Sequence, residues 1–113
     1  MNDAIGIIEM YGFVTAITVA DACAKAADVK VLAIDSNKPA NAETAEVPLI
    51  MAVKIQGSVS AVRAAVDEGS KIAQSISGLI GAHVIARPTD DAQKMSERSS
   101  VGRDRLGHIK NNA

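Results

Sequence analysis

The sequence predicts an α+β fold, a ferredoxin-like sandwich with the element order βαββαβ and two helices on one face of an antiparallel sheet. Four short apolar runs rich in β-branched residues lie between residues 4 and 86, which indicates strands. Two longer segments between those runs have helical periodicity. With 113 residues, 48% of them apolar, the chain is expected to form one domain around a small core of Ala, Val, Ile and Leu in thin layers.

The first half of the chain supplies a strand, a helix and a second strand. Residues 4–9 (AIGIIE) predict a buried strand, and residues 11–13 predict the turn after it. Residues 14–27 are too long and too rich in alanine for a strand, and they predict a helix with one narrow face. Residues 29–34 (VKVLAI) predict the second strand.

The second half repeats the pattern. Residues 49–56 (LIMAVKIQ) predict a strand, in which Leu49, Met51, Val53 and Ile55 share one face by period two. Ser58 is a predicted N-cap for a helix over 59–76, where apolar residues recur at three- and four-residue spacing. Residues 79–86 predict the last strand, which ends at Arg87 and Pro88.

The composition changes after Pro88. Residues 1–88 are therefore predicted to be the folded domain, and residues 89–113 a polar C-terminal tail that is partly helical or disordered. A short helical turn is predicted within 90–98.

A long connection separates the second and third predicted strands. Residues 35–48 (DSNKPANAETAEVP) are polar, contain two prolines and lack glycine. Adjacent elements of a compact domain are usually joined by about four to six residues. Longer loops held by a rigid scaffold often carry function, so this connection is the first candidate for a functional segment.

Composition excludes several classes of protein. The net charge is −1 and the only aromatic residues are Tyr11 and Phe13, so neither a basic stripe nor a stacking surface for nucleic acid is present. The opening run is too short for a signal peptide, and no stretch approaches the roughly 20 apolar residues that span a bilayer. With Cys23 as the single cysteine, we expect a cytoplasmic protein without a membrane partner or an intrachain disulfide.

The sequence offers no convergent set of reactive groups. His83 lies within a predicted strand and is interpreted as a structural or interface residue, and His108 lies in the tail. Cys23 is interpreted as a small buried apolar residue. No metal-binding, nucleophilic or phosphate-binding motif is found, so we predict neither catalytic residues, nor a metal, nor a cofactor.

Two charged residues lie at element ends, Lys25 near the end of the first predicted helix and Arg87 just after the last strand. They are either solvated charges or members of an edge used for self-association.

Several separated motifs, in the same order and at the same spacing, resemble a bacterial microcompartment shell protein of the single-domain, hexamer-forming family. The first half contributes AIGIIE (4–9), GFV (12–14) and ADACAKAA (20–27). The second half contributes GSVSAV (57–62), EG (68–69) and HVIARP (83–88). The resemblance covers residues 3–88 in one copy.

This resemblance implies a structural protein rather than an enzyme. Members of the family form flat cyclic hexamers that tile into the facets of a shell, together with other shell proteins, around encapsulated enzymes. Lys25 and Arg87 match the residues that meet between neighbouring hexamers. The connection at 35–48 falls where the family has a short, glycine-containing pore loop, so this loop is atypically long here.

The loop residues assigned to the pore or axis are Asp35, Ser36, Asn37, Lys38, Glu43 and Glu46. Three acids against one lysine give −2 per chain and −12 for six copies, a collar that would disfavour anions. The ion preference of the ring is the measurable consequence. Alternatively, the loop folds outward and the pore is wider or plugged. A different alternative is a trimeric, ferredoxin-like regulatory module that folds its long loop over a small ligand.

Overall fold

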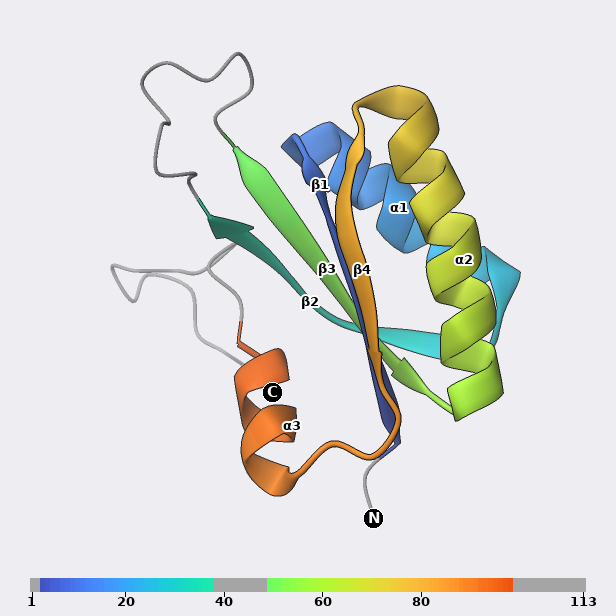
Figure 1. The fold of residues 1–113 in the computed structure, drawn as a ribbon, viewed down its shortest axis with the longest axis vertical. Coiled ribbons are helices and arrows are strands. Elements are labelled where there is room, and N and C mark those ends of the chain that lie inside the picture. Colours follow the sequence, from blue (N-terminus) through green and yellow to red (C-terminus); the bar gives the residue numbers. More distant parts are fainter. Residues whose placement is uncertain (1–2, 38–48, 99–113) are drawn as a thin grey trace, which may run out of the picture.

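The computed structural model describes residues 3–37 and 49–98, with four strands and three helices in these ranges (Figure 1). In chain order they are β1 (Ala4–Tyr11), α1 (Phe13–Ala26), β2 (Val29–Asn37), β3 (Ile50–Gly57), α2 (Val59–Ile76), β4 (Leu79–Ile85) and α3 (Asp90–Ser96). The order βαββαβ followed by a short helix confirms the predicted succession of elements.

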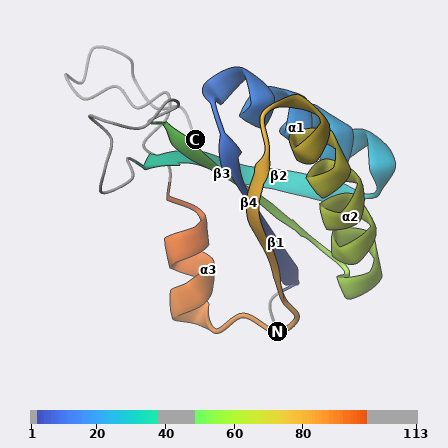
Figure 2. The same cartoon turned by 45° about the horizontal axis from the view of Figure 1, so that its top comes forward.

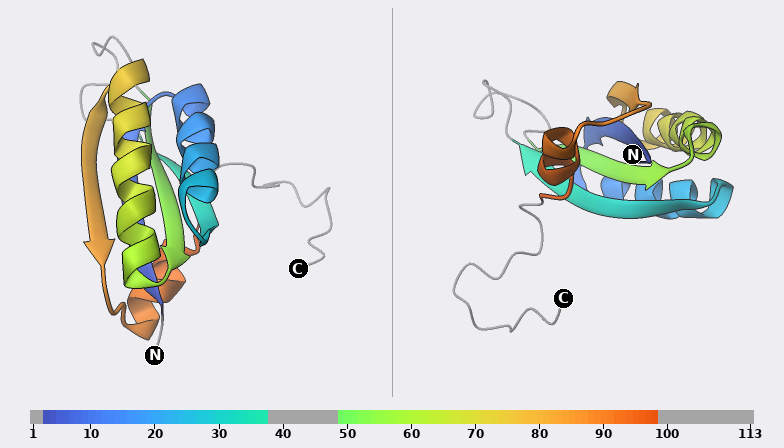
Figure 3. Two further views of the ribbon diagram at one scale, coloured as in Figure 1. Left: turned by 90° about the vertical axis from the view of Figure 1, so that its right-hand side faces the viewer. Right: turned by 90° about the horizontal axis from the view of Figure 1, so that it is seen from below.

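The four strands form one sheet in the order β2-β3-β1-β4, and each neighbouring pair is antiparallel. Helices α1 and α2 lie side by side on one face of this sheet (Figure 3). The predicted fold class is therefore confirmed. The predicted N-cap is confirmed as well, because Ser58 Oγ accepts a hydrogen bond from the Ala61 amide at 3.2 Å.

The core lies between the sheet and these two helices. Alternate residues of β1 and β3 point towards the helices, and Ile8, Met10, Met51, Val53 and Ile55 are fully buried. Gly6 allows α2 to approach β1 closely, since a Cβ atom there would lie 2.7 Å from Val66 Cγ2. The layers are thin because small residues stand at the contacts, as the alanine-rich composition predicts.

The second face of the sheet is partly covered by α3, which lies across it from α1 and α2 (Figure 2). Gln56 of β3 and Gln93 of α3 exchange side-chain hydrogen bonds of 2.7 and 3.3 Å. Ile5 stands beside Gln56 in the strand register and is fully buried although it points away from the α1–α2 core. The segment after Pro88 therefore contributes a helix that packs on the domain.

One predicted boundary was wrong. Asp35, Ser36 and Asn37 were assigned to the loop, but they belong to β2, where they pair with Ala52, Met51 and Ile50. The ladder with β3 continues past the apolar run because backbone pairing outweighs the low strand preference of Asp, Ser and Asn. The other assigned loop residues, Lys38, Glu43 and Glu46, lie outside the described residues. β1 is also longer than predicted and continues to Tyr11, which pairs with Ile50.

Candidate functional site

The strand register defines two ends of the sheet. At the first, Val29, Gly57 and Ala4 lie in one row, with the end of β4 beside them; we call it the Gly57 end. At the other, Asn37, Ile50 and Tyr11 lie in one row, and we call it the Ile50 end. The connection between β2 and β3 departs from the Ile50 end.

Lys25 lies at the Gly57 end, in the last turn of α1 just before β2 begins. Its side chain is 76% exposed, and Nζ lies 2.8 Å from Asp21 Oδ2 one turn earlier. An exposed pair of this kind contributes about 0.3–0.5 kcal/mol, so Asp21 does little to prevent Lys25 from taking another partner.

Arg87 also lies at the Gly57 end, in an exposed bend two residues beyond β4. Within residues 3–37 and 49–98, its side chain has no hydrogen bond or ion pair. Lys25 precedes β2 and Arg87 follows β4, and the sheet order places these two strands at opposite edges, roughly 14 Å apart from strand spacing alone.

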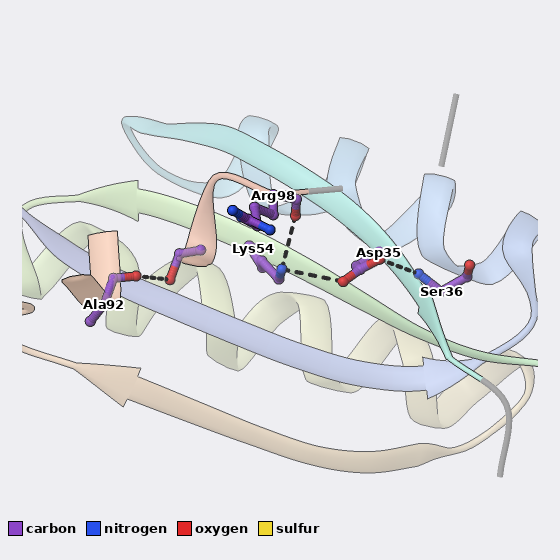
Figure 4. Close-up of polar contacts among 6 residues, drawn as sticks. Asp35, Ser36, Lys54, Ala92 and Arg98 are labelled. Carbon is purple, nitrogen blue, oxygen red and sulfur yellow. Dashed lines mark hydrogen bonds and ion pairs between the residues drawn. The ribbon is translucent and has the colours of Figure 1, made fainter. Parts of the chain in front are cut away.

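Midway along β3, Lys54 connects two parts of the chain that lie far apart in sequence (Figure 4). Its ammonium lies 3.6 Å from Asp35 Oδ2 and donates a hydrogen bond of 3.0 Å to the Arg98 carbonyl. The side chain is only 12% exposed. Asp35 Oδ1 in turn accepts a hydrogen bond of 2.9 Å from the Ser36 amide.

Sequence reasoning missed Lys54. Its only signal is a lysine at an alternate position of the apolar strand LIMAVKI, a pattern that also fits a solvated side chain. What distinguishes Lys54 is the segment folded over it, and that contact is not visible in local sequence.

A hollow of about 260 Å³ lies on the second sheet face near Lys54. Glu9 and Asp35 stand in one row across β1, β3 and β2, with Ala52 between them. Ser36 and Ile50 complete the lining. On the β4 side, His83 Nε2 lies 3.9 Å from Glu9 Oε1, and the His83 side chain is largely exposed.

Among the residues that the structure describes, no three His, Cys, Asp or Glu side chains are grouped so that they could hold a metal ion. Cys23 is buried between the helices and donates a hydrogen bond of 3.3 Å to the Ala65 carbonyl. Burial raises the pKa of its thiol to about 11, which opposes formation of the nucleophilic thiolate. No described helix is long and apolar enough to cross a membrane.

Comparison with known proteins gives consistent similarities. The family model described as the BMC domain matches residues 4–88. The chain is 33% identical over 100 residues to the bacterial microcompartment shell protein EutM of Salmonella typhimurium, an alignment covering 88% of this chain and 95% of EutM. It is 34% identical over 93 residues to the shell protein EutK of the same organism, covering 82% of this chain but only 51% of EutK. The chain thus spans about half the length of EutK.

Among solved structures, a microcompartment protein from Desulfitobacterium hafniense DCB superposes with a TM-score of 0.64 at 24% identity. The superposition covers 85% of this chain and 48% of that protein. At this identity the likeness concerns the fold.

Proposed function

The chain belongs to the BMC domain family of bacterial microcompartment shell proteins, and from this membership we propose that it is a structural tile, a cyclic hexamer that packs edge to edge in the facets of a shell. Its partners are further copies of itself, other shell proteins and the encapsulated enzymes. The role is non-enzymatic, and the shell is where the protein acts.

The observation that carries this proposal is that the two ends of the sheet carry different candidate residues. A flat ring needs one end of each subunit at the axis and the opposite end at the perimeter. Lys25 and Arg87 both lie at the Gly57 end, on opposite edges of the sheet, whereas the β2–β3 connection leaves from the Ile50 end. The perimeter role of the two cations and the axial role of the connection are thus compatible in one orientation of the subunit.

We keep the residues assigned to the pore or axis in that role, but the negative charge proposed for the ring becomes smaller. Asp35 stands beside Lys54, so these two charges cancel locally. Counting Lys54 with the six loop residues reduces the net charge from −2 to −1 per chain and from −12 to −6 per ring. The remaining charge belongs to Lys38, Glu43 and Glu46, outside the described residues.

The edge role is tested by replacing Lys25 with alanine. We expect Lys25→Ala to leave rings intact, because the residue lies at the perimeter, and to reduce the extent of sheets seen by electron microscopy. Lys71→Ala is a matched control: Lys71 is also exposed and paired with an aspartate one turn earlier, Asp67, but in α2. Normal sheets from Lys25→Ala, or equal loss from both variants, would contradict the edge role.

The mass in solution tests the ring itself. Sedimentation of the wild-type protein should give six chains per particle. A discrete trimer that binds a small ligand would instead favour the regulatory module.

A further inference from the structure

Helix α3 is attached to the second face of the sheet mainly by polar contacts. Ser96 is the buried residue of this seven-residue helix, whereas Met95 is 62% exposed. Gln93 exchanges hydrogen bonds of 2.7 and 3.3 Å with Gln56 of β3. Elements with few buried apolar contacts open at a lower free energy than the core. We therefore expect α3 and the two residues after it, which we call the α3 segment (residues 90–98), to open before the core does.

The last part of β2 is a second element that can open separately. The ladder between β2 and β3 shifts register between Val31 and Ala33, so the pairs from Ala33 to Asn37 form a block of their own. We call residues 33–37 the β2 end. An irregularity of this kind interrupts a ladder locally, and within the described sheet β2 is an edge strand paired with β3. The stability of the β2 end therefore depends on side-chain contacts to β3 as well as on the backbone pairs.

Lys54 contacts both of these elements. It pairs with Ala33, the first residue of the β2 end, and its ammonium lies 3.6 Å from Asp35 Oδ2. The same ammonium donates the hydrogen bond of 3.0 Å to the carbonyl of Arg98, the last residue of the α3 segment (Figure 4). Because the Lys54 side chain is only 12% exposed, these two acceptors take the place of most of its water.

We propose that Lys54 couples the two elements, so that the α3 segment and the β2 end open and close together. The carboxylate of Asp35 lowers the cost of covering the Lys54 ammonium, and it thereby stabilises the closed position of the α3 segment. In return, the α3 segment keeps water away from Lys54, and the attraction between Lys54 and Asp35 is stronger where water is excluded. Such a coupling is necessarily reciprocal, and each element stabilises the other to the same extent.

The coupling links two parts of the chain to which different roles are assigned. Asp35, Ser36 and Asn37 of the β2 end are residues of the proposed pore or axis, whereas the α3 segment follows the family domain. A partner that lifts the α3 segment off the sheet would therefore loosen the β2 end without contacting it. The coupling itself concerns one chain and does not depend on the hexamer, and its consequence for the axis rests on the proposed function.

The test loosens the α3 segment and measures amide hydrogen exchange at the β2 end. Gln93→Ala removes the hydrogen bonds with Gln56 and leaves Lys54 and Asp35 in place. We expect the paired amides of residues 33–37 to exchange faster by about threefold or more, together with those of α3. Met95→Ala is the matched control, because Met95 lies in the same helix and is exposed, and it should leave both rates at the wild-type value.

A double-substitution cycle assigns the effect to Lys54. In the Lys54→Met background, Gln93→Ala should cause no further acceleration at the β2 end, because the link between the two elements is already removed. In the opposite direction, Asp35→Asn keeps the shape of the side chain, removes its charge and should accelerate exchange in α3. Asp67→Asn, which removes the charge of an exposed pair in α2, should leave exchange in α3 unchanged.

Three results would overturn the inference. Wild-type exchange in α3 of Gln93→Ala would show that the helix is held by other contacts. Faster exchange in α3 with wild-type exchange at the β2 end would show that the two elements open independently. Equal acceleration of the β2 end by Gln93→Ala with and without Lys54 would assign the coupling to other residues. Each of these results leaves the proposed hexamer intact, since the mass in solution tests it separately.

Discussion

Replacing Lys54 by methionine tests whether one largely covered lysine side chain holds the end of β2 and the segment after α3 together. Methionine retains an unbranched apolar stem, so the change removes the charge while largely preserving the packing. Hydrogen bonds that involve a charged group contribute about 1.5–3 kcal/mol. Part of that is recovered, because Asp35 is 36% exposed and water can solvate it after the substitution. We therefore expect a loss of about 1–2 kcal/mol in the free energy of unfolding.

A loss of this size should lower Tm by roughly 5–10 °C for a domain of about 100 residues. Lys71→Met is the matched control, since Lys71 forms an exposed pair with Asp67 and its replacement should change the free energy by less than about 0.5 kcal/mol. Both variants should be compared with the wild type at one protein concentration, because assembly raises apparent stability.

Hydrogen exchange provides the specific readout. In Lys54→Met, amides of α3 should exchange faster than in the wild type, because the Arg98 carbonyl has lost its anchor on β3. Equal Tm values for the two variants, or unchanged exchange in α3, would refute the role assigned to Lys54.

Two further predictions concern the core. Gly6→Ala should destabilise the fold by about 1–3 kcal/mol in urea unfolding, since its Cβ would meet the stiff side chains of Val66 and Val62 at 2.7 and 2.9 Å. Gly81→Ala, whose nearest atom would be 3.5 Å away, should be neutral or slightly stabilising, and the reverse ranking would disprove the close approach of α2. Because burial raises the pKa of Cys23 from 9.0 to about 11, its contribution to stability is complete below pH 9 and is lost as the pH rises through 11. The stability difference between wild type and Cys23→Ala should shrink over that interval, and the native thiol should resist Ellman's reagent at pH 8; rapid reaction would contradict its burial.

Local sequence determined the elements with strong periodicity. The apolar stripe of 59–76 gave α2 with the bounds that the structure has, and Ser58 caps it because its hydroxyl can accept an amide hydrogen bond at the helix start. The apolar run at 49–56, with one face shared at period two, predicts β3 to within a residue at each end. Both signals arise because one face of the element is buried and the other is exposed. The spacing of apolar residues within a single element is enough to reveal this difference.

Periodicity within one element could not predict where β2 ends or which groups Lys54 contacts. Asp35, Ser36 and Asn37 have the composition of a loop, and they form a strand because β3 supplies hydrogen-bond partners for their backbone. Lys54 stands at an alternate position of its strand, where a solvated side chain would also be expected. It is covered because the chain returns with α3 more than 30 residues later.

The sequence by itself determined the succession of elements, the thin alanine-rich core and the positions of Lys25 and Arg87 at element ends. Only the tertiary structure decided that these two cations lie at one end of the sheet and that the β2–β3 connection leaves from the other. Periodicity fixes which face of an element is buried, because that depends on neighbours along the chain. Which ends of different elements meet depends on strand order and register, and these are set by contacts between residues that are distant in sequence.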